Sequence, residues 1–208
     1  MVKSGLIMFD YDGVIVDSFE VHARNFIVAC QENEFNEVNN YKDLLDLYEG
    51  NIYSGLSAKG LTKSTIDQIL KDYAIKQKTS LQGVRLFQGM KECIEILAKS
   101  NEIYIITSNV SDAVVDVLER LKVRGFQDVI GAEKEKSKVK KIKTLKSKYS
   151  NLASFYVGDT KGDIFEGKEA GVKTIGVSWG WHGKARLMEA VPDYIVEYPE
   201  ELVNLLSN

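Results

Sequence analysis

The chain has 208 residues, of which 44% are hydrophobic and 27% charged. This length suits one domain, or one domain with a small accessory unit, and this composition can bury a sizeable core. The 27 basic residues against 30 acidic ones give a formal net charge of −3. No global positive field is available to hold a nucleic acid or an anionic membrane, so neither is expected as a partner.

The apolar runs are too short to cross a membrane. The run at 103–106 is far below the ~20 residues that a membrane-spanning helix needs. The N-terminal run at 6–9 is likewise too short for a secretory signal and has no small-residue cleavage site. Cys30 and Cys93 lie far apart without a neighbouring His, and we expect them to be buried thiols. We therefore expect a cytoplasmic protein.

The first expected element is a buried strand at 6–9, and a helical stretch follows it. Residues 16–84 contain no convincing strand, and helical patterns are found near 17–32, 41–48 and 63–78. We predict that 16–84 forms a helical cap domain, joined through hinges near 14–18 and 81–89. Substrate specificity would then come from cap residues, around 51–59.

From residue 85 onward, short apolar runs alternate with segments of helical period. The runs are typical of strands covered on both faces, and the alternation predicts an α/β fold with a doubly wound parallel sheet. Ligands of such sheets bind at the carboxyl ends of the strands. The catalytic core would comprise 1–15 and 85–208. Its expected strands are 6–9, 103–106, 128–130, 153–157 and 174–177, and its expected helices are 87–99, 111–122, 138–149 and 161–171.

Acidic residues follow two of the expected strands. Asp10 and Asp12 end the first strand, while Asp159 and Asp163 follow the strand at 153–157. Each pair alone could be a turn or a helix start. Four carboxylates at one edge of a sheet, however, repel one another unless a cation or protons intervene. Oxygen ligands without a nearby His or Cys suit Mg²⁺ best.

Two hydroxyl residues, Thr107 and Ser108, end another strand just before a helix. Side-chain hydroxyls and unpaired backbone N–H groups at such a position favour an oxyanion such as phosphate, and a simple helix cap is the alternative.

A run of lysines extends from 134 to 148, and most of it reads as a solvated helix face. Lys138 differs because it follows the expected N-cap Ser137, which places a cation against the helix dipole. An anion bound near the start of this helix would explain why a lysine is found there. Lys136 could fill the same role, and we favour Lys138.

One reaction uses all of these groups, namely attack by a carboxylate on a phosphate ester. Both reactants are anionic, and two unit charges ~4 Å apart repel by about 4 kcal/mol even at an effective dielectric of ~20. A divalent metal and a lysine would offset that repulsion. A second acid could protonate the leaving alcohol and then activate water.

The order Asp-x-Asp-Gly-Val, Thr-Ser-Asn, Lys and Gly-Asp-x-x-x-Asp resembles the haloacid dehalogenase superfamily of phosphohydrolases. Within it, the chain is most similar to the phosphoglycolate-phosphatase-like branch with a helical cap. The resemblance implies a Rossmann-like core beneath a mobile cap. It also implies that Asp10 is the nucleophile and Asp12 the general acid/base.

The same resemblance implies how phosphate and metal are bound. Thr107, the backbone at Ser108 and Lys138 would bind the transferring phosphate. The Mg²⁺ ligands would be Asp10, Asp12 through its backbone carbonyl, Asp159 and Asp163, the last directly or through water.

We therefore expect a phosphoric monoester hydrolase that acts on a small phosphorylated metabolite, with phosphoglycolate the family's most frequent label. A sugar phosphomutase would share every residue named above and is the nearest alternative. A receiver-like signalling domain also has a phospho-acceptor Asp, but a helical insert would have no purpose there.

The roles of three further residues are open. We interpret His22 as a polar residue of the cap rather than as a proton-transfer group. Trp179 and Trp181 either border the site or pack beneath the last helix. The substrate and the oligomeric state stay open.

Overall fold

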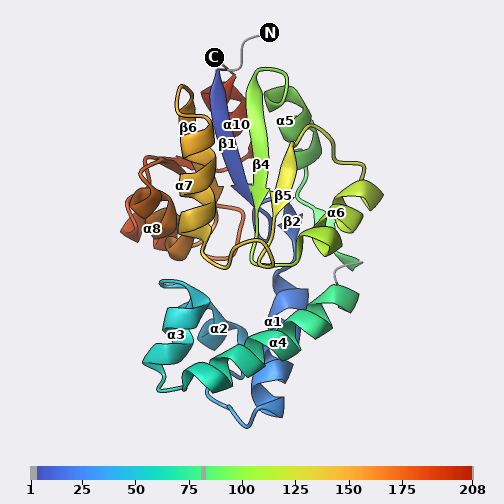
Figure 1. The fold of residues 1–208 in the computed structure, drawn as a ribbon, viewed down its shortest axis with the longest axis vertical. Coiled ribbons are helices and arrows are strands. Elements are labelled where there is room, and N and C mark those ends of the chain that lie inside the picture. Colours follow the sequence, from blue (N-terminus) through green and yellow to red (C-terminus); the bar gives the residue numbers. More distant parts are fainter. Residues whose placement is uncertain (1–3, 81–82, 208) are drawn as a thin grey trace.

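A computed structural model describes residues 4–80 and 83–207. Its main feature is a six-stranded sheet in the order β5-β4-β1-β6-β7-β8, with every neighbouring pair parallel (Figure 1). The predicted α/β class and the doubly wound parallel sheet are confirmed. The strands are β1 (Gly5–Asp10), β4 (Asn101–Ile106), β5 (Asp128–Ile130), β6 (Ala153–Gly158), β7 (Lys173–Val177) and β8 (Tyr194–Val196).

Helices cover both faces of the sheet, and alternate residues of β1 show why. Ile7 and Phe9 belong to a hydrophobic cluster with the helices α5 (Met90–Leu97), α6 (Ser111–Arg120) and α10 (Pro199–Leu206). Leu6 and Met8 point the other way, into a cluster with α7 (Lys138–Lys148) and the end of α8 (Lys161–Ala170). The helix α9 (Gly183–Glu189) packs against α8. Because both faces are buried, β1 has no polar residue before its last one, Asp10.

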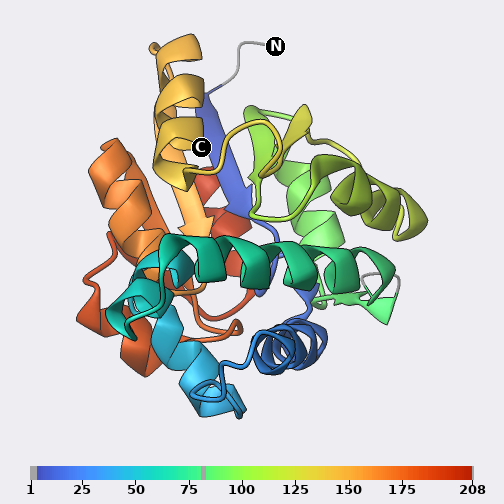
Figure 2. The same cartoon turned by 60° about the horizontal axis from the view of Figure 1, so that its bottom comes forward.

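Four helices lie beyond the carboxyl ends of the strands, opposite the chain termini (Figure 1). They share a hydrophobic cluster of their own that includes Phe26, Leu44, Leu56 and Ile69. Figure 2, with that side turned forward, shows α4 lying across the front of the molecule. The helices are α1 (Phe19–Glu32), α2 (Tyr41–Leu47), α3 (Ile52–Ala58) and α4 (Lys63–Ser80).

The sequence predicted three of these helices but not α3. The glycines around it made 50–60 read as a separator, yet Asn51 caps the helix by accepting a hydrogen bond from the Ser54 N–H. Gly55 is required for packing, since a Cβ there would lie 2.6 Å from the Leu47 carbonyl oxygen. The glycine therefore marks a close helix–helix contact.

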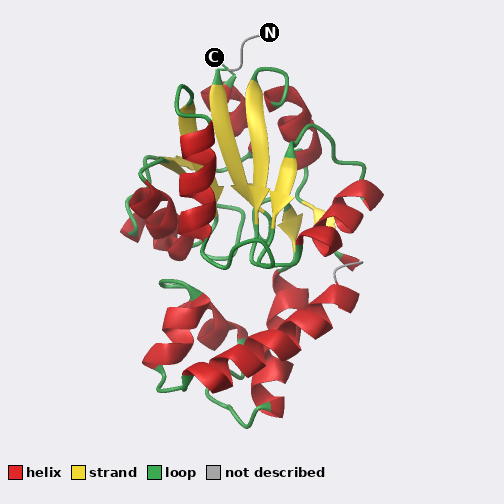
Figure 3. Cartoon of the chain, in the orientation of Figure 1, coloured by secondary structure: helices red, strands yellow, loops and turns green. Residues whose placement is uncertain are grey.

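The two connections between these helices and the core pair with each other. The two-residue strands β2 (Val16–Asp17) and β3 (Arg85–Leu86) form an antiparallel sheet, seen as short arrows in Figure 3. The expectation that 16–84 holds no strand was wrong at Val16 and Asp17. Residues 81–82 of the second predicted hinge lie outside the described residues, and the domain boundaries at 15/16 and 84/85 stay a prediction. Within the described part of the chain, no helix combines the length and apolarity that crossing a membrane requires.

Candidate active site

Three buried carboxylates meet at the carboxyl edge of the sheet. Asp10 ends β1, Asp159 follows the adjacent β6, and Asp163 lies in the first turn of α8. One carboxylate oxygen from each lies within 4.8 Å of the others, and the three residues are only 6%, 1% and 2% exposed. Three carboxylates at this spacing can hold a divalent cation through oxygen ligands.

The electrostatics of this cluster also fit a cation. Burial raises the pKa of Asp10 to about 8 against the attraction of Lys138, and the charges of Asp163 and Asp12 raise it further. Burial likewise raises the pKa of Asp159 well above its usual value, with the charges of Asp163 and Asp10 adding to the effect. A bound cation would relieve this repulsion, so the residues present suit the Mg²⁺ that the sequence suggested.

Lys138 bridges two of the acids. Its Nζ donates to Asp10 Oδ2 and to Asp163 Oδ1, each at 2.8 Å. It is the first residue of α7, after the N-cap Ser137, whose side chain accepts from the Lys140 N–H. Burial opposes its charge, but the two carboxylates outweigh this effect and raise the pKa of Lys138 well above its usual value. Lys136 is exposed, so the structure brings Lys138 to the acids.

Asp163 combines the two interpretations that the sequence left open. It belongs to a capping box in which Thr160 Oγ1 accepts from the Asp163 N–H while Asp163 Oδ2 accepts from the Thr160 N–H. Its other oxygen accepts from Lys138 and, at 3.1 Å, from the Tyr156 hydroxyl. Burial alone would raise the pKa of Asp163, but Lys138 and the Thr160 hydrogen bonds hold it below its usual value.

Asp12 lies beside this cluster with a different set of partners. Its two carboxylate oxygens accept from Ser18 Oγ and Asn109 Nδ2, each at 2.6 Å. Its carboxylate is not among the three grouped oxygens, and its predicted metal contact through the backbone carbonyl stays a prediction. The chain turns immediately afterwards at Gly13, where φ is +73° and a Cβ would lie 2.0 Å from Asp159 Oδ2. Only glycine allows this approach.

The predicted phosphate loop follows β4, which pairs with β1 so that Ile106 lies opposite Asp10. Thr107 is fully buried, and its Oγ1 accepts from the Asn109 N–H at 3.0 Å, while Ser108 is exposed. Register therefore places both residues at the edge that carries Asp10.

A second lysine of α7 supports this loop, and the sequence analysis missed it. Lys141 is 2% exposed, and its Nζ donates to the Thr107 carbonyl oxygen at 2.7 Å. Burial lowers its pKa to about 8. The available signal was its spacing, since residues three apart on a helix share a face and Lys138 already pointed inward.

The loop after β7 lies between the acids and two residues of the four-helix unit, His22 in α1 and Tyr48 directly after α2. The backbone N–H of Trp181 donates to Asp159 Oδ2 at 2.7 Å. The centroid of the Trp181 ring lies 4.5 Å from that of the His22 ring and 5.2 Å from that of the Tyr48 ring. Trp179 instead packs against the core and donates from Nε1 to the Val14 carbonyl oxygen. Of the two tryptophans, Trp181 borders the candidate site.

Comparison with known families agrees with this geometry. A family model described as haloacid dehalogenase-like hydrolase matches residues 7–177. The chain belongs to this family. The resemblance noted in the sequence is thereby confirmed, and the chain is a hydrolase of the haloacid dehalogenase-like family.

Relatives of this hydrolase match it over nearly their whole length. A phosphoglycolate phosphatase of Aquifex aeolicus is 26% identical, over 98% of this chain and 97% of that protein. A pyrophosphatase PpaX of Bacillus mycoides is 24% identical, over 99% and 98%. The structure of a haloacid dehalogenase-like family protein from Streptococcus pneumoniae superposes with a TM-score of 0.79 at 24% identity, over 97% and 98%. This likeness shows a shared fold.

Proposed function

We propose that this haloacid dehalogenase-like hydrolase is a Mg²⁺-dependent phosphatase that acts on a small phosphorylated metabolite through an aspartyl-phosphate at Asp10. The observation that carries the proposal is the double contact of Lys138 with Asp10 and Asp163 beside Asp159. A cation between a candidate nucleophile and a candidate metal ligand is suited to receive the phosphate group. The named relatives, a phosphoglycolate phosphatase and a pyrophosphatase, support a small phosphorylated substrate.

Asp10 would act as the nucleophile. Its Oδ1 accepts from the Tyr11 N–H at 2.8 Å and its Oδ2 from Lys138, so the carboxylate is held in one orientation. Attack of a carboxylate oxygen on phosphorus expels the alcohol and leaves the phosphate on Asp10. Thr107 and Ser108, at the end of the neighbouring strand, would bind the phosphate oxygens together with Lys138.

Asp12 would transfer the protons. Burial raises its pKa, while the hydrogen bonds from Ser18 and Asn109 counteract the effect and fix the carboxyl group in place. A carboxyl group with a raised pKa can give its proton to the leaving alcohol. The resulting carboxylate can then take a proton from the water that attacks the phosphate on Asp10.

Asp10, Asp159, Asp163 and the Asp12 backbone carbonyl would hold Mg²⁺. The ion would supply the positive charge that two approaching anions require. Binding of the metal to these residues can be measured separately from turnover.

The direct test is phosphate release from a panel of esters that includes phosphoglycolate, pyrophosphate and sugar phosphates. We expect release with Mg²⁺, none in excess chelator, and poor activity with Ca²⁺, whose coordination is looser and higher. Asp10→Asn is the matched control and should release none. Full activity in excess chelator would contradict the metal assignment, and transfer of phosphate between sugars without net release would indicate a mutase.

A further inference from the structure

Tyr48 of the cap is held against the helix that carries Asp163. Its backbone carbonyl accepts from the Gly162 N–H at 3.3 Å. A Cβ on Gly162 would lie 2.1 Å from the Gly50 carbonyl oxygen, so 48–50 packs directly on the first turn of α8. This contact brings the Tyr48 side chain to the carboxyl edge of the sheet.

The Tyr48 phenol faces the proposed catalytic acids from the cap side. The centroid of its ring lies 5.2 Å from that of the Trp181 ring, and the backbone N–H of Trp181 donates to Asp159. Burial raises the pKa of the phenol well above its usual value, and the charge of Asp12 raises it further. The charges of Asp10 and Asp163 also act on Tyr48, whereas of these acids only Asp12 acts on Tyr73. Together with the contact of its ring with Trp181, this makes Tyr48 the tyrosine nearer the proposed catalytic acids.

His22 lies between two tyrosine hydroxyls. Its Nε2 is 2.8 Å from the Tyr48 hydroxyl, and its Nδ1 is 2.5 Å from the Tyr73 hydroxyl. Burial lowers the pKa of His22 to about 3, so the ring is neutral and has one N–H and one accepting nitrogen. Two arrangements of the hydrogens are therefore available.

In the first arrangement the Tyr48 O–H donates to Nε2 and the Nδ1–H donates to the Tyr73 oxygen. The Tyr73 O–H then has no acceptor among the hydrogen bonds of the described residues. In the second, the Tyr73 O–H donates to Nδ1 and the Nε2–H donates to the Tyr48 oxygen. The hydrogen left over is then that of Tyr48, beside the proposed reaction centre. A buried donor without an acceptor costs free energy in either arrangement. An oxygen of the substrate at the proposed reaction centre can accept from Tyr48 but not from Tyr73, so a bound substrate with an accepting oxygen favours the second arrangement.

Trp181 adds a second donor at the same place. Its indole N–H is buried and has no hydrogen-bond partner within residues 4–80 and 83–207. Its ring contacts both His22 and Tyr48. In the second arrangement, two donors without an acceptor therefore lie together in this aromatic cluster.

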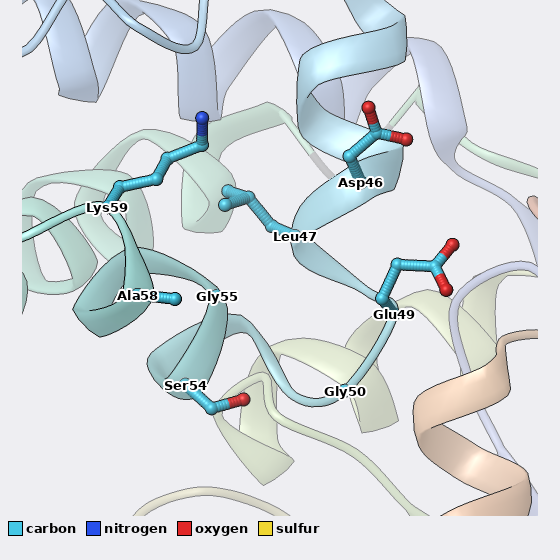
Figure 4. A pocket seen from close by; sticks show the side chains of 8 residues that line it. All are labelled: Asp46, Leu47, Glu49, Gly50, Ser54, Gly55, Ala58 and Lys59. Atoms are coloured by element: carbon cyan, nitrogen blue, oxygen red, sulfur yellow. The ribbon is translucent and has the colours of Figure 1, made fainter.

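We propose that Tyr48, oriented by His22 and Tyr73, donates a hydrogen bond to the leaving group, and that the enzyme prefers phosphate esters whose alcohol carries an accepting oxygen. This inference rests on the proposed phosphatase function. It moves specificity away from 51–59, where the sequence analysis placed it. Residues of that segment, including Ser54 and Lys59, line a surface pocket of about 450 Å³ between α2 and α3 (Figure 4).

Three small esters test the proposal, because they differ in a single group. Ethyl phosphate has no polar group on its alcohol, 2-hydroxyethyl phosphate offers an accepting oxygen, and protonated 2-aminoethyl phosphate offers only donors. We expect kcat/KM to be roughly three- to tenfold higher for the hydroxyethyl ester than for the ethyl ester, as one hydrogen bond provides. The aminoethyl ester should be the poorest of the three. The opposite arrangement of hydrogens would make it the best.

Two variants then test the role of each tyrosine. Tyr48→Phe keeps the ring against Trp181 but removes the hydroxyl, so the ratio of the hydroxyethyl to the ethyl kcat/KM should fall to about one. Tyr73→Phe lets the Tyr48 hydroxyl turn towards Nε2, so the same ratio should fall although Tyr73 is not placed on the substrate. Tyr53→Phe, on the outer part of α3, is the control and should keep the wild-type ratio.

The outcomes separate this inference from the proposed function. If the enzyme hydrolyses no ester, either among these three or in the larger panel, the proposed function and this inference are both overturned. Hydrolysis with a preference for the aminoethyl ester, or with a ratio that Tyr48→Phe leaves unchanged, would overturn this inference alone. A fall of the ratio in Tyr48→Phe but not in Tyr73→Phe would overturn the orienting role of His22 and Tyr73.

Discussion

Lys141 Nζ lies 2.7 Å from the main-chain carbonyl oxygen of Thr107 and donates a hydrogen bond to it. Both groups are buried, and this bond links α7 to the loop at the end of β4. The same helix presents Lys138 to Asp10 one turn earlier. A single helix thus positions a charge for the phosphate and supports the loop proposed to bind it.

Replacement of Lys141 should therefore weaken phosphate binding. In Lys141→Met the Thr107 carbonyl loses its donor, and we expect KM for a phosphate ester to rise by roughly tenfold, with a smaller change in kcat. Lys143→Met, on the exposed face of α7, is the matched control and should behave like the wild type. The opposite result, a normal KM in Lys141→Met, would show that the loop holds its shape without this bond.

The lowered pKa of Lys141 predicts that the stability of the fold depends on pH. The pKa of Lys141 falls from 10.5 to about 8 on folding, so between these values the unfolded chain binds more protons than the folded one. The free energy of unfolding contributed by Lys141 should therefore increase as the pH rises from about 8 to 10.5. Urea unfolding of the wild type and Lys141→Met across this range measures the effect. A difference that stays constant, or that moves against the wild type, would contradict it.

Lys138→Ala should be far more damaging to turnover than Lys136→Ala. Loss of Lys138 leaves Asp10 and Asp163 without their shared cation, and we expect kcat to fall by about 10²-fold or more. Removing one partner of a buried ion pair also costs about 3 kcal/mol of stability. Steady-state kinetics and thermal unfolding of both variants check this, and an equal loss of kcat in the exposed Lys136→Ala would refute the assignment.

Ion pairs join α2 and the residues directly after it to α8 and α9, and we expect them to stabilise a closed position of the predicted cap. Arg186 of α9 contacts Asp46 at 3.1 Å and also Glu49, and Lys161 contacts Glu49 as well. Partly exposed pairs contribute up to about 1 kcal/mol each and weaken in salt. We expect Arg186→Gln to open the cap more often and to increase protease cleavage near the hinge at 14–18.

The matched control for this variant is Lys184→Gln, because Lys184 pairs with Glu197 within the core. It should leave the cleavage pattern unchanged. Added salt should raise cleavage in the wild type towards the level of Arg186→Gln. Equal cleavage of the wild type and Arg186→Gln at low salt would argue against a role for these ion pairs in cap closure.

The sequence predicted those features that depend on local patterns. Buried strands appear as apolar runs, and acidic residues directly after them must lie at one edge of a parallel sheet, as Asp10 and Asp159 do. Lys138 could be singled out because its position against the helix dipole is a local anomaly. The roles assigned to these residues stay predictions until variants are measured.

The features that the sequence missed depend on contacts between distant segments. Strands β2 and β3 have two residues each and exist only because Val16 pairs with Leu86. Burial of Lys141 depends on how α7 lies on the sheet, which the lysine-rich composition of the helix concealed. The set of Tyr48, His22 and Tyr73 comes from three elements of the cap, so no spacing along the chain indicates it.

In the proposed mechanism Asp10 carries the phosphate and Asp12 transfers the protons. An activated aryl phosphate needs no proton on its leaving group, so Asp12→Asn should complete the first step and stall at the second. Rapid acid quench followed by intact mass spectrometry should then show one added phosphate on Asp12→Asn and none on Asp10→Asn. An equal amount of added phosphate on Asp10→Asn would show that another residue is the nucleophile and would refute the role proposed for Asp10.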